Sequence, residues 1–296
     1  MIRRHPVLSY FALALAVSWL LWLPRIATEQ GWWSRDVPEW WHYAGAAGPI
    51  TAAVLVTAFV DGRAGVRTLF ARYWPASAPV GWLLFGVVSP LVLLGVGLVA
   101  ARLVDGAWPE YAAVAKTRNL PAIGLPLTLL VHVLTYAVGE ETGWRGFALP
   151  RLQQSRRALP ATGLLLIGWG LWHVPSFFEN PSYADMNGAM LVGWALGLAL
   201  GAVFLTWLFN SARGSLLVIV LWHGLFNLFT ASEAGEGTIA AVVSSGVMVL
   251  AIAALLVAGP DELRGLSRRA GPRVRYESPA RPGETARAAA LRARSR

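Results

Sequence analysis

The chain has 296 residues, of which 56% are hydrophobic and only 14% are charged. Soluble globular proteins carry roughly a quarter charged residues, so this composition excludes an ordinary soluble domain. The absence of cysteine excludes disulfides, cysteine-based metal sites and a cysteine nucleophile. Apolar runs of about 20 residues recur along the chain, and each is long enough to cross a bilayer as a helix. The sequence therefore predicts an all-α fold, a polytopic transmembrane helix bundle.

The apolar runs and the loops between them predict eight membrane spans. Their approximate ranges are 7–25, 43–60, 79–103, 123–148, 159–175, 188–209, 215–231 and 238–258. Because the connections are short, we expect one helical domain over residues 1–260. The remaining residues, 261–296, form a basic tail with little to bury, and we expect this tail to be disordered and cytoplasmic.

The net charge is +9, and its distribution along the chain is typical of a membrane protein rather than of a nucleic-acid-binding protein. One set of alternate loops carries Arg3, Arg4, Arg63, Arg67, Arg72, Arg151, Arg156, Arg157, Arg213 and the tail. The other set carries Glu29, Asp36, Glu39, Asp105, Glu110, Glu179, Asp185, Glu233 and Glu236. The exceptions are Arg25, Arg35, Lys116 and Arg118. Since cytoplasmic loops are enriched in arginine, both termini are predicted in the cytoplasm of a multi-pass cell-membrane protein.

The first three predicted spans are apolar and carry little chemistry. Arg3 and Arg4 precede the first span as in a signal peptide, but no clear cleavage pattern follows, so we interpret this span as an uncleaved anchor. His5 and His42 lie near predicted interfaces and carry no functional signal.

The fourth span ends in GEETGWRG, residues 139–146, where charge is unexpected. Glu141 and Arg145 are four residues apart, so they share a helix face and can neutralise one another. Glu140 points about 100° away and has no local cation. His132, earlier in the same span, has no predicted partner, and we expect it to be structural.

The fifth and seventh spans carry further polar residues, which inside a membrane normally face the bundle interior. His173 in the fifth span follows Trp169 by one turn, and Pro175 should end or kink the helix. His223 and Asn227 in the seventh span are four apart and share a face. Each site alone fits a structural hydrogen bond, but a carboxylate, two imidazoles and an amide on three nearby spans favour hydrolysis.

These side chains allow two kinds of hydrolytic chemistry. They could bind zinc and activate a metal-bound water. Alternatively, the carboxylate and one imidazole could act as a base on water while the other imidazole and the amide stabilise an oxyanion.

Three motifs in the second half of the sequence resemble those of a known family. EETGWR matches the EExxxR motif of the CAAX prenyl protease 2 and bacteriocin-processing family of intramembrane proteases, the CPBP or Abi family. WGLWH resembles the second motif, with Trp169 where the family usually has phenylalanine, and HGLFN matches the HxxxN motif. The resemblance covers about residues 125–230, and the three motifs follow the family's order.

This resemblance implies roles for individual residues. Glu140 and His173 would activate the water, and His223 and Asn227 would hold the oxyanion. The supporting residues would be Glu141, Arg145 and Trp169. The protease-like core would span about residues 123–232.

The same resemblance implies an endopeptidase that cleaves a membrane-embedded or lipidated protein or peptide, as in CAAX-type processing or a related reaction. We expect that no cofactor is required. The alternative is zinc, held by Glu140, His173 and His223.

Two other functions are open from the sequence. A non-catalytic membrane protein could protect its own cell against a bacteriocin-like peptide, and Glu140 would then be dispensable. A secondary transporter is less favoured, because such proteins commonly have two related halves and the sequence has no second EExxxR or HxxxN motif.

The predicted spans place the candidate residues at unequal depths. By rise per residue, Glu140 and His223 should lie within about three turns of the cytoplasmic side, and His173 should lie deeper. Tilted helices, or a hairpin of spans four and five that projects into the cytoplasm, would bring them level.

Overall fold

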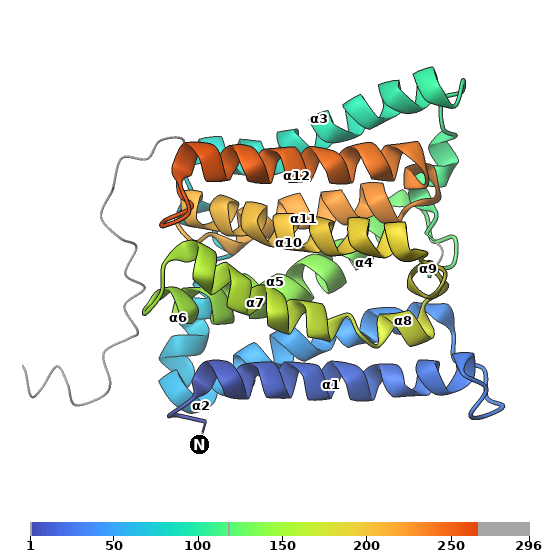
Figure 1. The fold of residues 1–296 in the computed structure, drawn as a ribbon. Helices are drawn as coiled ribbons and strands as arrows, with labels where there is room; N and C mark the ends of the chain where they lie inside the picture. Colours follow the sequence, from blue (N-terminus) through green and yellow to red (C-terminus); the bar gives the residue numbers. More distant parts are fainter. Residues whose placement is uncertain (1, 118, 266–296) are drawn as a thin grey trace, which may run out of the picture.

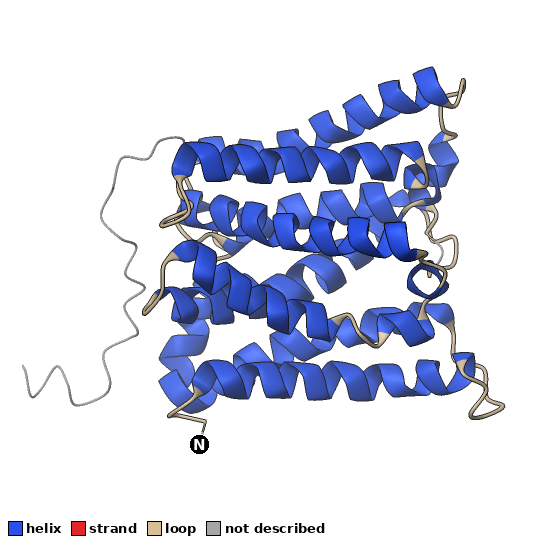
Figure 2. Ribbon diagram, in the orientation of Figure 1, coloured by secondary structure: helices blue, strands red, loops and turns tan. Residues whose placement is uncertain are grey.

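The computed structural model describes residues 2–117 and 119–265, and helices dominate these ranges (Figure 2). Apart from one isolated antiparallel bridge between Thr117 and Ser232, the described residues form no β-structure. The predicted all-α fold class is therefore confirmed.

The long helices correspond closely to the predicted spans. They are α1 (Pro6–Glu29), α2 (Ala47–Ala71), α3 (Val80–Val104), α7 (Ala158–Trp172), α10 (Gly188–Ser211), α11 (Leu216–Ala231) and α12 (Thr238–Ala258). The fourth span is one continuous helical run in which α- and π-helical turns alternate: α4 (Leu125–His132), η4 (Val133–Gly139), α5 (Glu140–Gly143), η5 (Trp144–Ala148) and α6 (Leu149–Gln153). Connections contain η1 (Glu39–Ala46), η2 (Pro75–Ser77), η3 (Tyr111–Ala115), α8 (Ser176–Glu179), α9 (Pro181–Ala184) and η6 (Glu233–Gly235).

Length and composition identify 6 helices that can cross a membrane within the described residues. They are Pro6–Glu29, Glu39–Ala71, Val80–Val104, Ala158–Glu179, Gly188–Ser211 and Thr238–Ala258. α11 is apolar but shorter, and the fourth predicted span alternates between α- and π-helical turns. An exposed apolar stripe on α3 includes Leu84, Val88, Val92, Val96 and Val99. Such a surface suits lipid, and the chain is a multi-pass membrane protein; its eight spans remain a prediction.

The helices form three groups in space (Figure 1). α1 packs along α2 on one side, and α3 packs along α12 on the other. The segment α4 to α6, with α7, α10 and α11, lies between these pairs. The start of α1 and the end of α12 lie at the same end of the bundle. The interior is therefore built mainly from the part of the chain that carries the predicted motifs.

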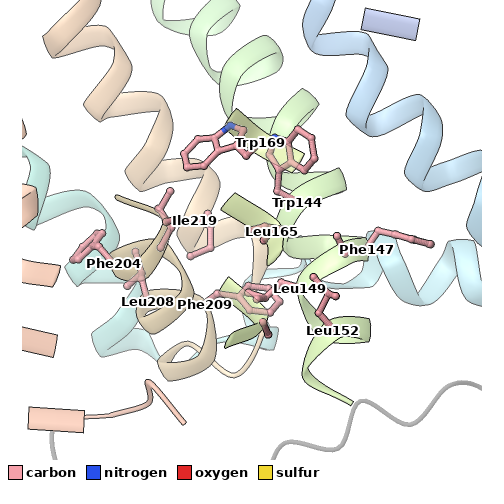
Figure 3. Close-up of a cluster of buried hydrophobic side chains, with 14 of the residues drawn as sticks. Trp144, Phe147, Leu149, Leu152, Leu165, Trp169, Phe204, Leu208, Phe209 and Ile219 are labelled. Carbon is pink, nitrogen blue, oxygen red and sulfur yellow. The ribbon is translucent and has the colours of Figure 1, made fainter. Parts of the chain in front are cut away.

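A large hydrophobic cluster holds this central group together (Figure 3). It joins Phe147 of η5, Leu165 of α7, Leu208 of α10 and Ile219 of α11, all fully buried. Complete burial of such side chains stabilises the bundle by about 1.5–3 kcal/mol each where the alternative is exposure to water. The cluster fixes the relative positions of the helices that carry the candidate site.

The first residues of the predicted tail are packed. The carbonyls of Pro260 and Asp261 accept hydrogen bonds from the first amides of α7, at 3.1 and 2.8 Å. Leu263 is fully buried, and the indole of Trp207 donates to the carbonyl of Gly265 at 2.9 Å. Residues 266–296, the rest of that tail, lie outside the described residues.

Candidate active site

The two glutamates lie on a short α-helical turn, α5, between the π-helical segments η4 and η5. π-helical turns are rare and occur frequently at functional sites. Glycine makes this turn fit against its neighbours. A Cβ on Gly143 would lie 2.3 Å from the hydroxyl of Tyr10, and one on Gly139 would lie 2.7 Å from the carbonyl of Ala46. The glycines of GEETGWRG therefore allow close backbone packing.

Glu140 lies in the interior of the bundle, with 3% of its surface exposed. Its Oε2 accepts a hydrogen bond from the indole Nε1 of Trp169 on α7, at 2.9 Å. This contact places α5 beside α7, one turn before His173. In Figure 1, α7 runs obliquely to α1; the relative depth of Glu140 and His173 in the membrane stays a prediction.

Glu141 forms the ion pair with Arg145 that the four-residue spacing predicts. Nη1 of Arg145 lies 2.9 Å from Oε1 of Glu141, and both side chains are completely buried. The same Oε1 accepts a hydrogen bond from Nδ1 of His223 at 2.7 Å, a contact that the sequence pattern does not predict. Glu141 therefore links the fourth predicted span to the seventh.

Trp169 is at the centre of the group. Its N–H binds Glu140, and the guanidinium of Arg145 stacks over its ring at 4.6 Å. The rings of His173 and His223 lie 5.8 and 6.3 Å from its ring. The tryptophan thus contacts or adjoins a residue from each of the three motifs.

His173 lies where α7 ends, before Pro175, and is 9% exposed. Its Nδ1 lies 2.8 Å from the carbonyl oxygen of Trp169. A carbonyl only accepts hydrogen bonds, so Nδ1 carries the proton and Nε2 is left as the base. His223 likewise donates through Nδ1, in its case to a carboxylate.

Asn227 lies one turn beyond His223 on α11 and is half-buried. Its side chain has no hydrogen-bond partner among the residues that the structure describes. The structure therefore places Asn227 on the predicted helix without joining it to Glu140 or His173.

The three predicted zinc ligands do not form a metal site as placed. Across residues 2–117 and 119–265, no three His, Asp or Glu side chains are grouped closely enough to hold a metal ion. In this arrangement Glu140 binds an indole instead.

Two further histidines are buried near the group. His42, whose sequence context carries no functional signal, pairs through Nδ1 with Oε1 of Glu179 at 2.6 Å. His132 is completely buried, and neither ring nitrogen has a partner in the described part of the chain. Its ring meets the ring edge of Tyr136 at 5.3 Å. The pairing of His42 could not be read from the sequence, because 137 residues separate it from Glu179.

Comparisons with known proteins identify the same part of the chain. The model of the Rce1-like family, described as type II CAAX prenyl endopeptidase Rce1-like, matches residues 122–229. CAAX prenyl protease 2 of Methanococcus maripaludis is 31% identical over 134 residues, which cover 44% of this chain and 49% of the relative. The chain thus spans about half the length of the curated relative that it matches.

The family-model match coincides with the segment that holds the three motifs and the buried polar group. The described fold is all-helical and membrane-spanning, as the motifs imply. Over residues 122–229, the chain is therefore similar to the Rce1-like family of CAAX prenyl endopeptidases.

Proposed function

We propose that this protein is an intramembrane endopeptidase that hydrolyses a peptide bond of a membrane-associated protein or peptide, in CAAX-type processing or a related reaction. The buried group of Glu140, Trp169 and the two histidines, in a segment similar to the Rce1-like family, supports the proposal. The catalytic core comprises residues 123–232 of a helical domain over 1–260, and both termini face the cytoplasm.

The two histidines have different hydrogen-bond partners, and we assign their catalytic roles from this difference. Nδ1 of His173 donates to a neutral carbonyl, so its Nε2 is suited to accept a proton. Nδ1 of His223 donates to the carboxylate of Glu141 instead. As an imidazolium, His223 would present its Nε2 hydrogen to an oxyanion. This difference fits His173 beside the water and His223 beside the substrate carbonyl.

The reaction then needs no covalent intermediate. Glu140, assisted by His173, takes a proton from water as the water oxygen attacks the carbonyl carbon. His223 and Asn227 donate hydrogen bonds to the oxyanion that forms. The proton is passed to the leaving nitrogen as the carbon–nitrogen bond breaks, which yields a carboxylate and an amine. Asn227 has a free side-chain amide for this role.

The proposed activity is tested with purified protein in liposomes and a synthetic peptide that ends in a prenylated CAAX sequence. Mass spectrometry in ¹⁸O-labelled water should show two fragments, with one labelled oxygen in the new carboxyl group. A matched peptide without the lipid measures dependence on the membrane anchor. Intact peptides in both cases, with protein shown to be folded, would contradict the proposal.

His223→Ala and Asn227→Ala separate transition-state from ground-state effects. Loss of one oxyanion donor typically costs about 10²–10³-fold in kcat, and we expect each variant to lose turnover with little change in KM. A rise in KM at unchanged kcat would place these residues in substrate binding instead.

A further inference from the structure

α7 ends just before His173, and on the α7 side the imidazole is held by its 2.8 Å bond to the carbonyl of Trp169. α7 stops at Trp172, and Pro175 lacks the amide that would continue the helix. The chain then forms α8, a helix of only four residues, with the amide of Ser176 bonded to the carbonyl of His173 at 2.9 Å. Besides its bond to Trp169, the position of His173 therefore also depends on what holds α8.

One strong contact holds α8 from the inside. Oε1 of Glu179, the last residue of α8, lies 2.6 Å from Nδ1 of His42 on η1. The two side chains are only 1% and 8% exposed. The second carboxylate oxygen of Glu179 has no partner among the described residues. A buried carboxylate with one partner is strongly tied to that partner, because separation would leave the charge uncompensated.

His42 is itself fixed by the rest of the bundle. Trp22 donates its indole hydrogen to the carbonyl of His42 at 2.7 Å and stacks on the imidazole at 5.9 Å. Trp22 also packs on Trp172, whose ring adjoins that of His173 at 4.9 Å. Trp22 of α1 thus contacts both His42 and the end of α7, and it links the His42–Glu179 pair to the region around His173.

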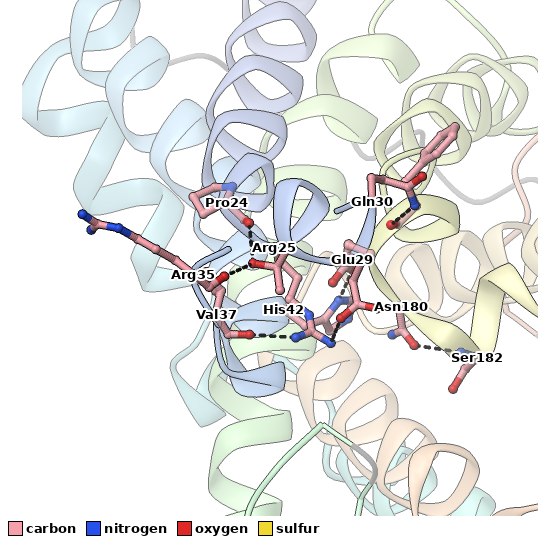
Figure 4. A network of polar contacts seen from close by, with 12 residues as sticks. Pro24, Arg25, Glu29, Gln30, Arg35, Val37, His42, Asn180 and Ser182 are labelled. Atoms are coloured by element: carbon pink, nitrogen blue, oxygen red, sulfur yellow. Dashed lines mark hydrogen bonds and ion pairs between the residues drawn. The ribbon is translucent and has the colours of Figure 1, made fainter. Parts of the chain in front are cut away.

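A second contact to α8 is exposed and offers a matched control. Nε2 of Gln30 donates to the carbonyl of Phe178 at 3.0 Å (Figure 4). Asn180, also labelled in Figure 4, follows α8 and caps α9 by accepting a 3.0 Å bond from the amide of Ser182. The exposed bond from Gln30 ties α8 to the loop after α1, whereas Glu179 ties it to the interior.

We propose that Glu179 is a positioning residue: through its bond to His42 it fixes the turn after Pro175 and thereby holds His173 for catalysis. The proposal rests on the proposed peptidase function. Neither residue touches the reacting atoms in this scheme, and the effect passes through the imidazole of His173.

The kinetic test uses Glu179→Gln, which keeps the shape and removes the charge, in the full-length protein with the prenylated peptide. We expect kcat to fall about 10- to 100-fold with KM unchanged, since misplacement of a catalytic group by about 1 Å can cost about 10²-fold. The kcat of His42→Asn should fall by a similar factor, and the kcat of Gln30→Ala should equal that of the parent protein. In a His173→Ala background, Glu179→Gln should add no further loss.

Two results would overturn the proposal. One is a parent-like kcat for Glu179→Gln. The other is an equal fold-loss of kcat on Glu179→Gln in the parent protein and in the His173→Ala variant. If Glu140→Gln also retains full activity, the peptidase assignment fails as well, whereas an inactive Glu140→Gln beside an active Glu179→Gln removes only the role of Glu179.

A spectroscopic measurement covers the case in which no variant is active. The chain has 5 histidines, so ¹⁵N-histidine NMR signals can be assigned by single replacements. Glu179→Gln should shift the signals of both His42 and His173 and leave that of His5 unchanged. A His173 signal that does not move would refute the coupling.

Discussion

Replacement of Glu141 by glutamine should test the buried ion pair at the centre of the site. The substitution keeps the size of the side chain but removes the charge that faces Arg145 at 2.9 Å. Arg145 has no exposed side-chain surface, and its Nε and Nη2 have no partner among the described residues. Breaking one side of a buried pair typically costs about 3–5 kcal/mol, because a charge is left uncompensated. We expect a loss of stability in this range.

The double variant Glu141→Gln/Arg145→Met distinguishes this mechanism from simple loss of packing. Since both charges are removed together, it should be less destabilised than Glu141→Gln alone. Stability is measured by reversible unfolding in detergent, followed by the fluorescence of the 15 tryptophans. If the stability lost in the double variant equals the sum of the losses of Glu141→Gln and Arg145→Met alone, to within about 0.5 kcal/mol, the two sites are independent and the pair is refuted. Because Glu141 also binds His223, residual activity should fall even where the variant is folded.

Three further outcomes are expected. Reporter fusions after Arg72 and Arg157 should read cytoplasmic and a fusion after Asp185 external; the reverse pattern would invert the proposed topology. Trp169→Phe keeps an aromatic ring but removes the indole N–H that donates to Glu140. We expect kcat to fall about 10- to 100-fold, because hydrogen bonds to charged groups contribute about 1.5–3 kcal/mol. Chelators should leave hydrolysis intact, since carboxylate and imidazoles can divide the base and oxyanion roles; activity lost on chelation and restored by stoichiometric zinc would overturn this.

Much of the fold follows from local sequence patterns. Apolar runs predict most of the long helices to within several residues, as the match between predicted 188–209 and observed Gly188–Ser211 shows. α2 (Ala47–Ala71) is the exception, because it continues well past the predicted end at residue 60. Hydropathy does not reveal that the fourth predicted span contains π-helical turns on either side of Glu140. There, Gly139 and Gly143 pack closely against η1 and α1, which are far away in the sequence.

The candidate site divides in the same way. The spacing of Glu141 and Arg145 predicts their ion pair, because helical periodicity is local. The bond from His223 to Glu141 spans 82 residues, and the bond from His42 to Glu179 spans 137. Such pairings depend on tertiary packing, which no single-sequence periodicity encodes.

The rate of Glu140→Gln most directly tests whether this carboxylate activates water. The amide preserves the shape and can still meet the indole of Trp169, so the variant should fold with unchanged thermal stability. Loss of a general base typically costs about 10²–10⁴-fold, and cleavage of the prenylated peptide in single-turnover reactions should fall at least that far. If Glu140→Gln cleaves as fast as the parent protein, Glu140 is not the catalytic carboxylate, and the self-protection function becomes the better interpretation.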